Sequence, residues 1–217
     1  FIRNTDQILP IIFASYQFFD PFSIFRSLRF NSSFWSAFDF AGKNYGLGAN
    51  INSNAQFTNF WSANINFNME TPSLSNGTLR GGPAFMSPGA FRPSVNISSD
   101  ERKKFIVGVS AFAPVSFEGD SQTVGTNVEF TYRPLNMLSI AIIPNVMLNK
   151  SNLQYMEETS YHGDPRYIMG SIDQKIFGVS ARLNLTITPD FTIQYWGQPF
   201  IATGSYSNVK MITDPLA

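Results

Sequence analysis

The sequence predicts an all-β, antiparallel, up-and-down transmembrane β-barrel, and three observations lead to this fold class. Apolar and polar residues alternate along many segments, the alternating segments are long, and the links between them are short and long in turn. No segment approaches the roughly 20 consecutive apolar residues that a transmembrane helix needs. We therefore expect roughly ten strands in this chain and no helix.

The composition separates this chain from ordinary soluble domains. Charged residues make up 14% of its 217 residues, whereas about 25% is usual in soluble globular domains. The formal net charge is zero, so the sequence offers no basic footprint for nucleic acid. The chain contains no cysteine, which excludes disulfides and thiolate metal sites.

Alternation is clearest in the segment 61–70, "WSANINFNME". Its apolar members are Trp61, Ala63, Ile65, Phe67 and Met69, and its polar members are Ser62, Asn64, Asn66, Asn68 and Glu70. The same period recurs in the segments 24–40, 47–57, 105–117, 122–132, 138–148 and 177–187. A soluble β-sandwich is the alternative, but its exterior would then be a nearly uncharged face of Asn and Ser, which is poorly soluble. We expect the apolar faces to meet lipid and the amide faces to line a lumen.

The lengths of strands and links support the same fold. The segments 137–159 and 167–189 form two long arms around one loop, whereas a tilted membrane strand needs only about 9–11 residues to cross. This hairpin should project beyond the bilayer. Short links are expected at 58–59, 133–136 and 189–190, and longer links at 43–46, 73–89, 118–121 and 160–166. Short periplasmic turns and longer extracellular loops are typical of outer-membrane barrels.

Aromatic residues gather beside the short links. Rings at strand ends form the interfacial girdle of a membrane barrel. The residues expected in this girdle are Phe57, Trp61, Tyr132, Phe191 and Tyr195.

Several stretches, in order along most of the chain, resemble a Bacteroidota outer-membrane β-barrel family of uncharacterised function. These stretches are "DPFSIFR", "LRGGPAFMSPG", "SSDERKKF", "TYRPLNMLSI", "NKSNLQYMEE", "RYIMGSIDQK" and "LNLTITPDFTIQYWGQPFIATGSYSNVKMITDP". The resemblance implies an N-terminal carbohydrate-binding module similar to family-9 sugar-binding domains, and further strands after Ala217. Residues 1–217 are then a single partial outer-membrane β-barrel domain, and strands outside this sequence or another chain complete the barrel.

Candidate ligand-binding residues follow from the predicted lumen face and from one loop. Arg80 lies in the Gly- and Pro-rich loop 79–89, which either contacts a ligand or plug at the barrel mouth or is a structural loop. We favour the structural alternative, in which Arg80 pairs with a lumen carboxylate. The candidates are Arg29, Asn64, Asn66, Asn68, Arg80, Arg182, Asn184 and Trp196.

The remaining polar motifs are weak as sites. Asp39, Glu70 and Glu129 all alternate onto the polar face, where paired carboxylates for glycoside hydrolysis are conceivable. We expect them instead to pair with Arg29 and Arg182. His162, the only histidine, lies beside carboxylates on a loop tip and is weak as a metal ligand, so we expect no metal and no cofactor. The charged run 98–104 is either a solvated periplasmic turn or a docking point for a periplasmic partner.

The sequence therefore predicts a non-enzymatic, integral protein of the bacterial outer membrane that binds or passes glycans or related polymers. The alternative is a structural or accessory subunit of a larger outer-membrane complex, such as secretion or insertion machinery. The expected partners are the lipid bilayer, other outer-membrane or periplasmic proteins and glycans, with no nucleic acid.

Overall fold

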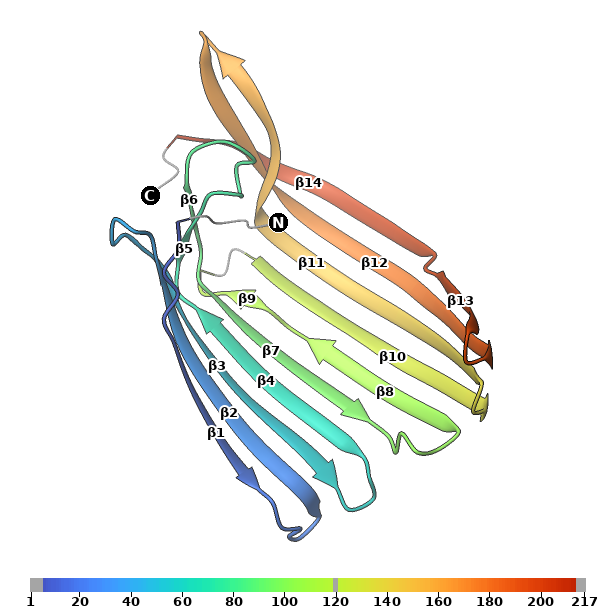
Figure 1. Ribbon diagram of the computed structural model, residues 1–217. Helices are drawn as coiled ribbons and strands as arrows, with labels where there is room; N and C mark the ends of the chain where they lie inside the picture. The colour runs from blue at the N-terminus through green and yellow to red at the C-terminus, as the bar shows by residue number, and fades with distance from the viewer. Residues whose placement is uncertain (1–5, 119–120, 214–217) are drawn as a thin grey trace.

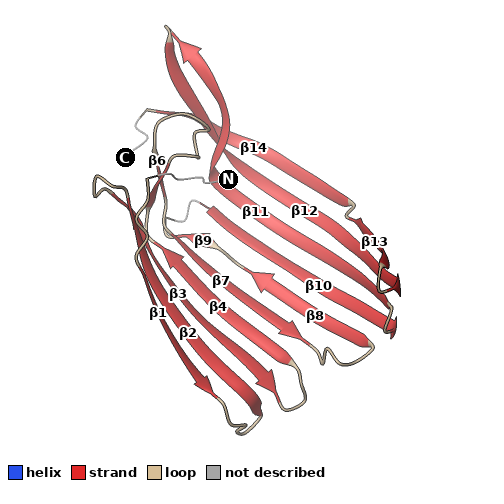
Figure 2. Cartoon of the chain, in the orientation of Figure 1, coloured by secondary structure: helices blue, strands red, loops and turns tan. Residues whose placement is uncertain are grey.

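The computed structural model describes residues 6–118 and 121–213, and within these ranges the chain is built of strands, turns and loops (Figure 2). One large antiparallel sheet has the strand order β1-β2-β3-β4-β7-β8-β10-β11-β12-β13, and it curves into an open trough (Figure 1). The ten positions of this path agree with the expected strand number. The described residues contain no helix long and apolar enough to cross a membrane.

The first part of the sheet is a meander followed by a small separate hairpin. Its strands are β1 (Ile11–Phe18), β2 (Phe25–Phe38), β3 (Asn44–Phe57), β4 (Ser62–Glu70) and β7 (Ala90–Ser98). The strands β5 (Ser73–Ser75) and β6 (Phe85–Ser87) pair only with each other, within the long link between β4 and β7.

The second part continues the same pairing. Its strands are β8 (Phe105–Phe112), β9 (Val115–Ser116), β10 (Ser121–Leu135), β11 (Leu138–Tyr161), β12 (Asp164–Thr188), β13 (Phe191–Gly197) and β14 (Phe200–Ile212). Both β13 and β14 pair with the same edge of β12. The two strands therefore form one sheet position that is interrupted at Gln198 and Pro199, where proline cannot donate to the ladder.

Turns and long links occupy opposite ends of the sheet. The turns 58–61, 99–104, 136–137 and 189–190 lie along the lower edge in Figure 1, and the long link 71–89 lies at the upper edge. We call the lower edge the turn end and the upper edge the loop end. The expected link 118–121 falls partly on residues 119–120, outside the described residues.

The link expected at 160–166 is much shorter than the sequence pattern indicated. The strands β11 and β12 continue until only His162 and Gly163 remain between them. Both residues have positive φ, at 52° and 90°, as a two-residue hairpin of the primed type requires. The two strands thus form a long hairpin that projects beyond the rest of the sheet (Figure 1), as their lengths predicted.

Closure of the sheet into a barrel is the part of the expected fold that the structure does not show. Among the described residues the sheet is open, with β1 at one edge and β13 with β14 at the other. The observed fold is therefore an all-β antiparallel sheet curved into a trough. We call its concave side the inner face and its convex side the outer face.

Burial in β4 is inverted relative to a soluble strand. Ile65 and Met69 keep 45% and 47% of their surface exposed. The alternate residues Asn64, Asn66 and Asn68 are half-buried. Across the sheet, large apolar side chains such as Leu47, Ile51, Phe130, Ile142 and Phe177 are likewise exposed. We call the large sheet the wall. Its outer face is therefore largely apolar, and the amides lie on its inner face.

The buried core lies at the loop end. Leu79, Phe85 and Met169 are buried against one another, and Leu153, Tyr155, Tyr167 and Ile212 pack around them. We call these seven residues the cap core. They join the link 71–89 to the projecting part of the β11–β12 hairpin and to the end of β14.

Candidate functional site

A row of polar residues crosses the inner face in strict cross-strand register. Because directly paired residues in antiparallel strands point to the same face, one polar register row places its side chains together. The row comprises Gln17, Arg29, Asn54, Asn64, Asn96, Ser110, Asn127 and Asn145, one from each of eight neighbouring strands. We call it the amide row.

Hydrogen bonds connect members of the amide row across strands. The amide Nδ2 of Asn64 donates to Oδ1 of Asn54 at 2.9 Å, and Nδ2 of Asn96 donates to Oδ1 of Asn64 at 3.3 Å. The guanidinium of Arg29 donates through Nε and Nη2 to Oε1 of Gln17, at 2.9 and 2.7 Å. Each amide supplies both a donor and an acceptor, so such a row can continue without charge.

A second, shorter set of amides joins the amide row on its loop-end side. Asn31 Nδ2 donates to Asn52 Oδ1 at 2.8 Å, and Asn54 Nδ2 donates to the same oxygen at 3.0 Å. Asn52 Nδ2 in turn donates to Asn50 Oδ1 at 2.8 Å, and Asn50 Nδ2 donates to Asn66 Oδ1 at 2.7 Å. Asn52 is therefore the node of a connected amide network over β2, β3 and β4.

All members of the amide row except Asn145 line a hollow of about 710 Å³ on the inner face. Residues from seven strands, β1 to β4, β7, β8 and β10, contribute to its wall. Its charged members are Arg29, Glu101 and Glu129, and the other polar members are amides and serines. The hollow is thus broad, almost neutral and rich in hydrogen-bonding groups.

Two amide oxygens on the inner face have no partner among the described residues. They are Oδ1 of Asn68 and Oδ1 of Asn145, and both atoms are buried. Asn145 lies opposite Gly178, where a Cβ would come within 2.7 Å of that oxygen. Buried acceptors without a donor are unfavourable, so these two positions are suited to a hydroxyl or amide donor from outside the chain or to water.

The predicted lumen residues fall into three places. Arg29 and Asn64 line the hollow, and Asn66 and Asn68 follow on the same face toward the loop end. Arg182, Asn184 and Trp196 lie together at the far side of the sheet, where Arg182 is opposite Trp196 and Asn184 is opposite Gln194. The structure therefore does not bring these three into the same hollow as Arg29.

Arg80 occupies a different site from the other candidates. Its guanidinium carbon lies 5.2 Å from the centre of the Tyr155 ring, beside the cap core. Among the described residues it forms no ion pair, so the expected pairing with a lumen carboxylate is wrong. Because Leu79 is buried in the cap core, the loop places Arg80 against a ring instead.

The expected pairing of Arg29 and Arg182 with carboxylates is also wrong. Glu70 pairs with Arg92 at 2.5 Å, and Glu129 Oε1 accepts a hydrogen bond from Thr131 at 2.8 Å. Asp39 Oδ1 accepts from the backbone N–H of Lys43 at 2.7 Å. The cross-strand register determines which side chains are neighbours. It places Glu70 and Glu129 toward opposite ends of the sheet, so they do not form a pair.

Sequence patterns missed several residues of the hollow. Asn96 was detectable, because Ser94, Asn96 and Ser98 alternate with Val95 and Ile97 along β7. Gln17 lies in β1, whose sequence "IIFASYQF" is apolar on both faces near the loop end. Only the pairing of Gln17 with Arg29 shows where its side chain belongs.

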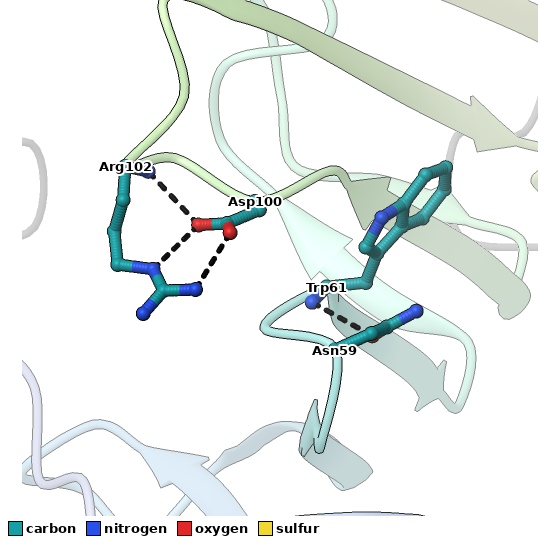
Figure 3. A network of polar contacts seen from close by, with 4 residues as sticks. All are labelled: Asn59, Trp61, Asp100 and Arg102. Carbon is teal, nitrogen blue, oxygen red and sulfur yellow. Dashed lines mark hydrogen bonds and ion pairs between the residues drawn. The ribbon is translucent and has the colours of Figure 1, made fainter.

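The turn end carries a compact charged cluster. Asp100, which is only 6% exposed, accepts hydrogen bonds from the backbone N, Nε and Nη2 of Arg102, at 3.0, 2.8 and 2.7 Å (Figure 3). These bonds lower the pKa of Asp100 from its ordinary value of 3.8 to about 2. The guanidinium carbons of Arg102 and Arg26 lie 3.1 and 4.5 Å from the centre of the Phe60 ring.

The predicted aromatic girdle is distributed along the turn end. Tyr132 and Tyr195 lie on one outer-face register row, which runs from Phe105 through Tyr132, Ile140 and Leu183 to Tyr195. Phe57 stacks on Phe25 with ring centres 5.4 Å apart. Trp61 is exposed, with its indole directed away from Arg102 (Figure 3), and Phe191 begins β13. Their interfacial role stays a prediction.

Metal-binding groups are sparse in the described part of the chain. Residues 6–118 and 121–213 contain no set of three or more His, Cys, Asp and Glu side chains that is arranged to hold a metal ion. The expectations of no metal, no cofactor and no enzymatic activity stay predictions.

Fold and site together define a class: an all-β protein with a curved antiparallel sheet, an apolar outer face and an amide-lined inner face. The family model described as "Domain of unknown function (DUF5916)" matches residues 1–214, so the chain belongs to this family. No curated protein and no solved structure matches the chain. The family match agrees with the expected membership of an uncharacterised family. The bacterial group and the sugar-binding module stay implications of the resemblance.

Proposed function

We propose that the chain is part of the wall of an integral outer-membrane β-barrel, without enzymatic activity, whose lumen binds or passes glycans or related polymers. The observation that carries this proposal is the inverted burial of the wall. Ile65 and Met69 are nearly half exposed, whereas Asn64 and Asn66 on the alternate face of the same strand are half-buried and hydrogen-bonded. An exposed apolar face of this extent is expected where lipid rather than water is the solvent.

The height of the apolar band supports the membrane part of the proposal. On the outer face of β11 the run Leu138, Ile140, Ile142, Pro144, Val146 and Leu148 is followed by Lys150. At about 3.3 Å per residue and a tilt of about 40°, this run covers about 25 Å of bilayer depth, the usual height of such bands. Lys150 pairs with Asp173 at 3.8 Å directly above the band, where solvent is expected.

The chemistry of the inner face supports the glycan part. Sugar hydroxyls both donate and accept hydrogen bonds, and an amide row offers both functions without the desolvation of a charge. The unpartnered oxygens of Asn68 and Asn145 add two acceptors. Because barrel strands are tilted by about 35–45°, a register row runs obliquely around a lumen. The amide row would then contact successive units of a linear polymer.

Current recordings on the full-length protein test both parts separately. In planar bilayers we expect ion conductance, and we expect linear neutral oligosaccharides to block it. Asn64→Leu combined with Asn96→Leu should weaken the block about thirtyfold, since two lost hydrogen bonds together contribute about 2 kcal/mol. The outer-face pair Ile65→Leu and Ile97→Leu, one residue away in sequence, is the matched control.

Each outcome of the recordings has a defined meaning. Failure of the full-length protein to insert would overturn the membrane assignment. Two outcomes would be compatible with a barrel but would reject a glycan-binding lumen: conductance that oligosaccharides do not block, and equal block of the conductance in both double variants.

A structural or accessory subunit of a larger outer-membrane complex, such as secretion or insertion machinery, is the second candidate. Two observations favour it: the edges of β1 and of β13 with β14, beside which no described strand lies, and the charged turn 99–104 at the turn end. An unpaired strand edge is a template for another strand. Native purification in mild detergent tests this candidate, and a protein that migrates alone would contradict it.

A further inference from the structure

Unpaired positive charge gathers on one turn and the neighbouring strand end at the turn end. Of the 15 Lys and Arg residues in the chain, Arg102, Lys103 and Lys104 lie on the turn that connects β7 to β8, and Arg133 lies near the end of β10. Arg102 is paired with Asp100. Lys103, Lys104 and Arg133 form no ion pair with any described residue.

The turn and the strand end enclose a second hollow of about 440 Å³. Its wall consists of residues 101–104 on the turn after β7 and residues 133–136 at the end of β10. Arg133 joins the two segments, since its backbone N–H donates to the carbonyl of Lys104 at 2.7 Å and its Nη1 donates to the carbonyl of Glu101 at 3.3 Å. We call this site the basic hollow. The hollow is built on strand ends that the sheet holds in place, and its net charge is positive.

Apolar surface begins immediately beside the basic hollow. Phe105 and Tyr132 are paired across β8 and β10 and are exposed on the outer face. Leu135, which lines the hollow, and the neighbouring Met137 are also exposed. The site therefore places three cations at one end of an exposed apolar surface, in the order of a charged head followed by hydrocarbon chains.

We propose that the basic hollow binds the phosphate headgroup of an anionic phospholipid, with Lys103, Lys104 and Arg133 around the phosphate and the acyl chains along Phe105 and Tyr132. The proposal rests on the membrane insertion proposed above. A lipid fits better than an acidic peptide, because the apolar surface beside the hollow continues into the outer face of the wall. Cations near an anionic bilayer surface each strengthen binding appreciably.

Native mass spectrometry of the full-length protein tests the proposal. The protein is purified with equal amounts of phosphatidylglycerol, which is anionic, and phosphatidylcholine, which is zwitterionic. We expect retained phosphatidylglycerol to exceed retained phosphatidylcholine about tenfold. The triple variant Lys103→Gln, Lys104→Gln and Arg133→Gln should reduce this preference to less than about twofold. The variant Lys43→Gln, Lys175→Gln and Lys210→Gln carries the same charge change on exposed residues outside the hollow and should keep the preference.

The outcomes separate this proposal from the one on which it rests. Treatment of membranes with alkaline carbonate first shows whether the protein is membrane-integral. Release of the protein into the soluble fraction would reject the membrane assignment itself. If the protein is integral, two results would overturn only the headgroup site: equal retention of both lipids, or the same loss of the phosphatidylglycerol preference in both triple variants. Displacement of phosphatidylglycerol by millimolar inorganic phosphate or by polyglutamate would also overturn it, in favour of a free-anion or peptide site.

Discussion

The wall and the cap core bury apolar side chains in opposite ways. In the wall, Ile65 and Met69 are 45% and 47% exposed, and the asparagines between them are half-buried. In the cap core, Leu79 and Met169 are 1% and 0% exposed. The same chain therefore uses an ordinary hydrophobic core above the sheet and an inverted arrangement within it.

Under our membrane proposal this difference reflects two solvents, water around the cap core and lipid around the wall. Burial of apolar surface stabilises a structure only when water is the alternative. The cap core follows that rule and belongs with the charged and polar part of the β11–β12 hairpin, near Lys150 and Asp173. The wall does not follow it, which is consistent with our proposal that lipid covers the outer face.

Truncation of the cap core should have the largest effect on stability. Met169→Ala should lower the free energy of unfolding of the cap by about 2–5 kcal/mol, because the cavity that it leaves is fully enclosed. Protease digestion of the link 71–89 measures this loss. Met211→Ala on the adjacent β14 is the control, since Met211 is 45% exposed. Equal protease sensitivity of both variants would contradict a water-excluding cap core.

A charge on the outer face of the wall should have the next largest effect. Val109→Arg should cost about 2–4 kcal/mol in folding into lipid vesicles, as expected for arginine near the bilayer midplane. Ser110→Arg, on the inner face one residue away, should change stability little. Urea titration of the full-length protein in vesicles measures both. A more harmful effect of Ser110→Arg would reverse the assignment of the two faces.

Removal of the amide node should have a moderate effect. Asn52→Leu deletes the acceptor of Asn31 and Asn54. In a wet lumen we expect a loss of about 1 kcal/mol, because water replaces part of each lost hydrogen bond. The outer-face substitution Ile51→Leu is the control, and unfolding in urea is the measurement. A loss above about 3 kcal/mol would indicate that the inner face is dry and occupied by protein.

Acid should lower the stability of the turn end only slightly. The pKa of Asp100 is lowered from 3.8 to about 2 in the folded chain, chiefly by the hydrogen bonds from Arg102. A lowered pKa stabilises the folded state above the ordinary value, and this stabilisation is lost as the pH falls from about 4 to about 2. The urea midpoint should therefore decrease over that range in the wild type and remain flatter in Asp100→Asn. Parallel curves would contradict the role of this carboxylate.

Periodicity predicted the two faces of the wall, because successive side chains along a strand point to opposite faces of the sheet. The long arms of β11 and β12 and the polar faces of β3 and β4 follow from a period of two. Cross-strand register is not encoded in that period. The partners of Arg29, Glu70 and Glu129 therefore had to come from the structure.

The cap core and the interrupted strand position were beyond sequence patterns for a different reason. Leu79 and Met169 are far apart in the sequence, and no periodicity joins a loop residue to a strand residue. The division between β13 and β14 depends on both strands pairing with β12. Pro199 suggests a break, but the continued pairing of the chain with the same edge of β12 after that break is a tertiary effect.

The orientation of the wall is tested most directly by spin labels along β4. The chain has no cysteine of its own, so single cysteines can be placed in turn at residues 63–69 of the membrane-reconstituted protein. We predict high accessibility to oxygen, which concentrates in lipid, at 63, 65, 67 and 69, and high accessibility to a polar nickel chelate at 64, 66 and 68. The opposite alternation, or nickel accessibility at every position, would contradict a lipid-facing outer surface.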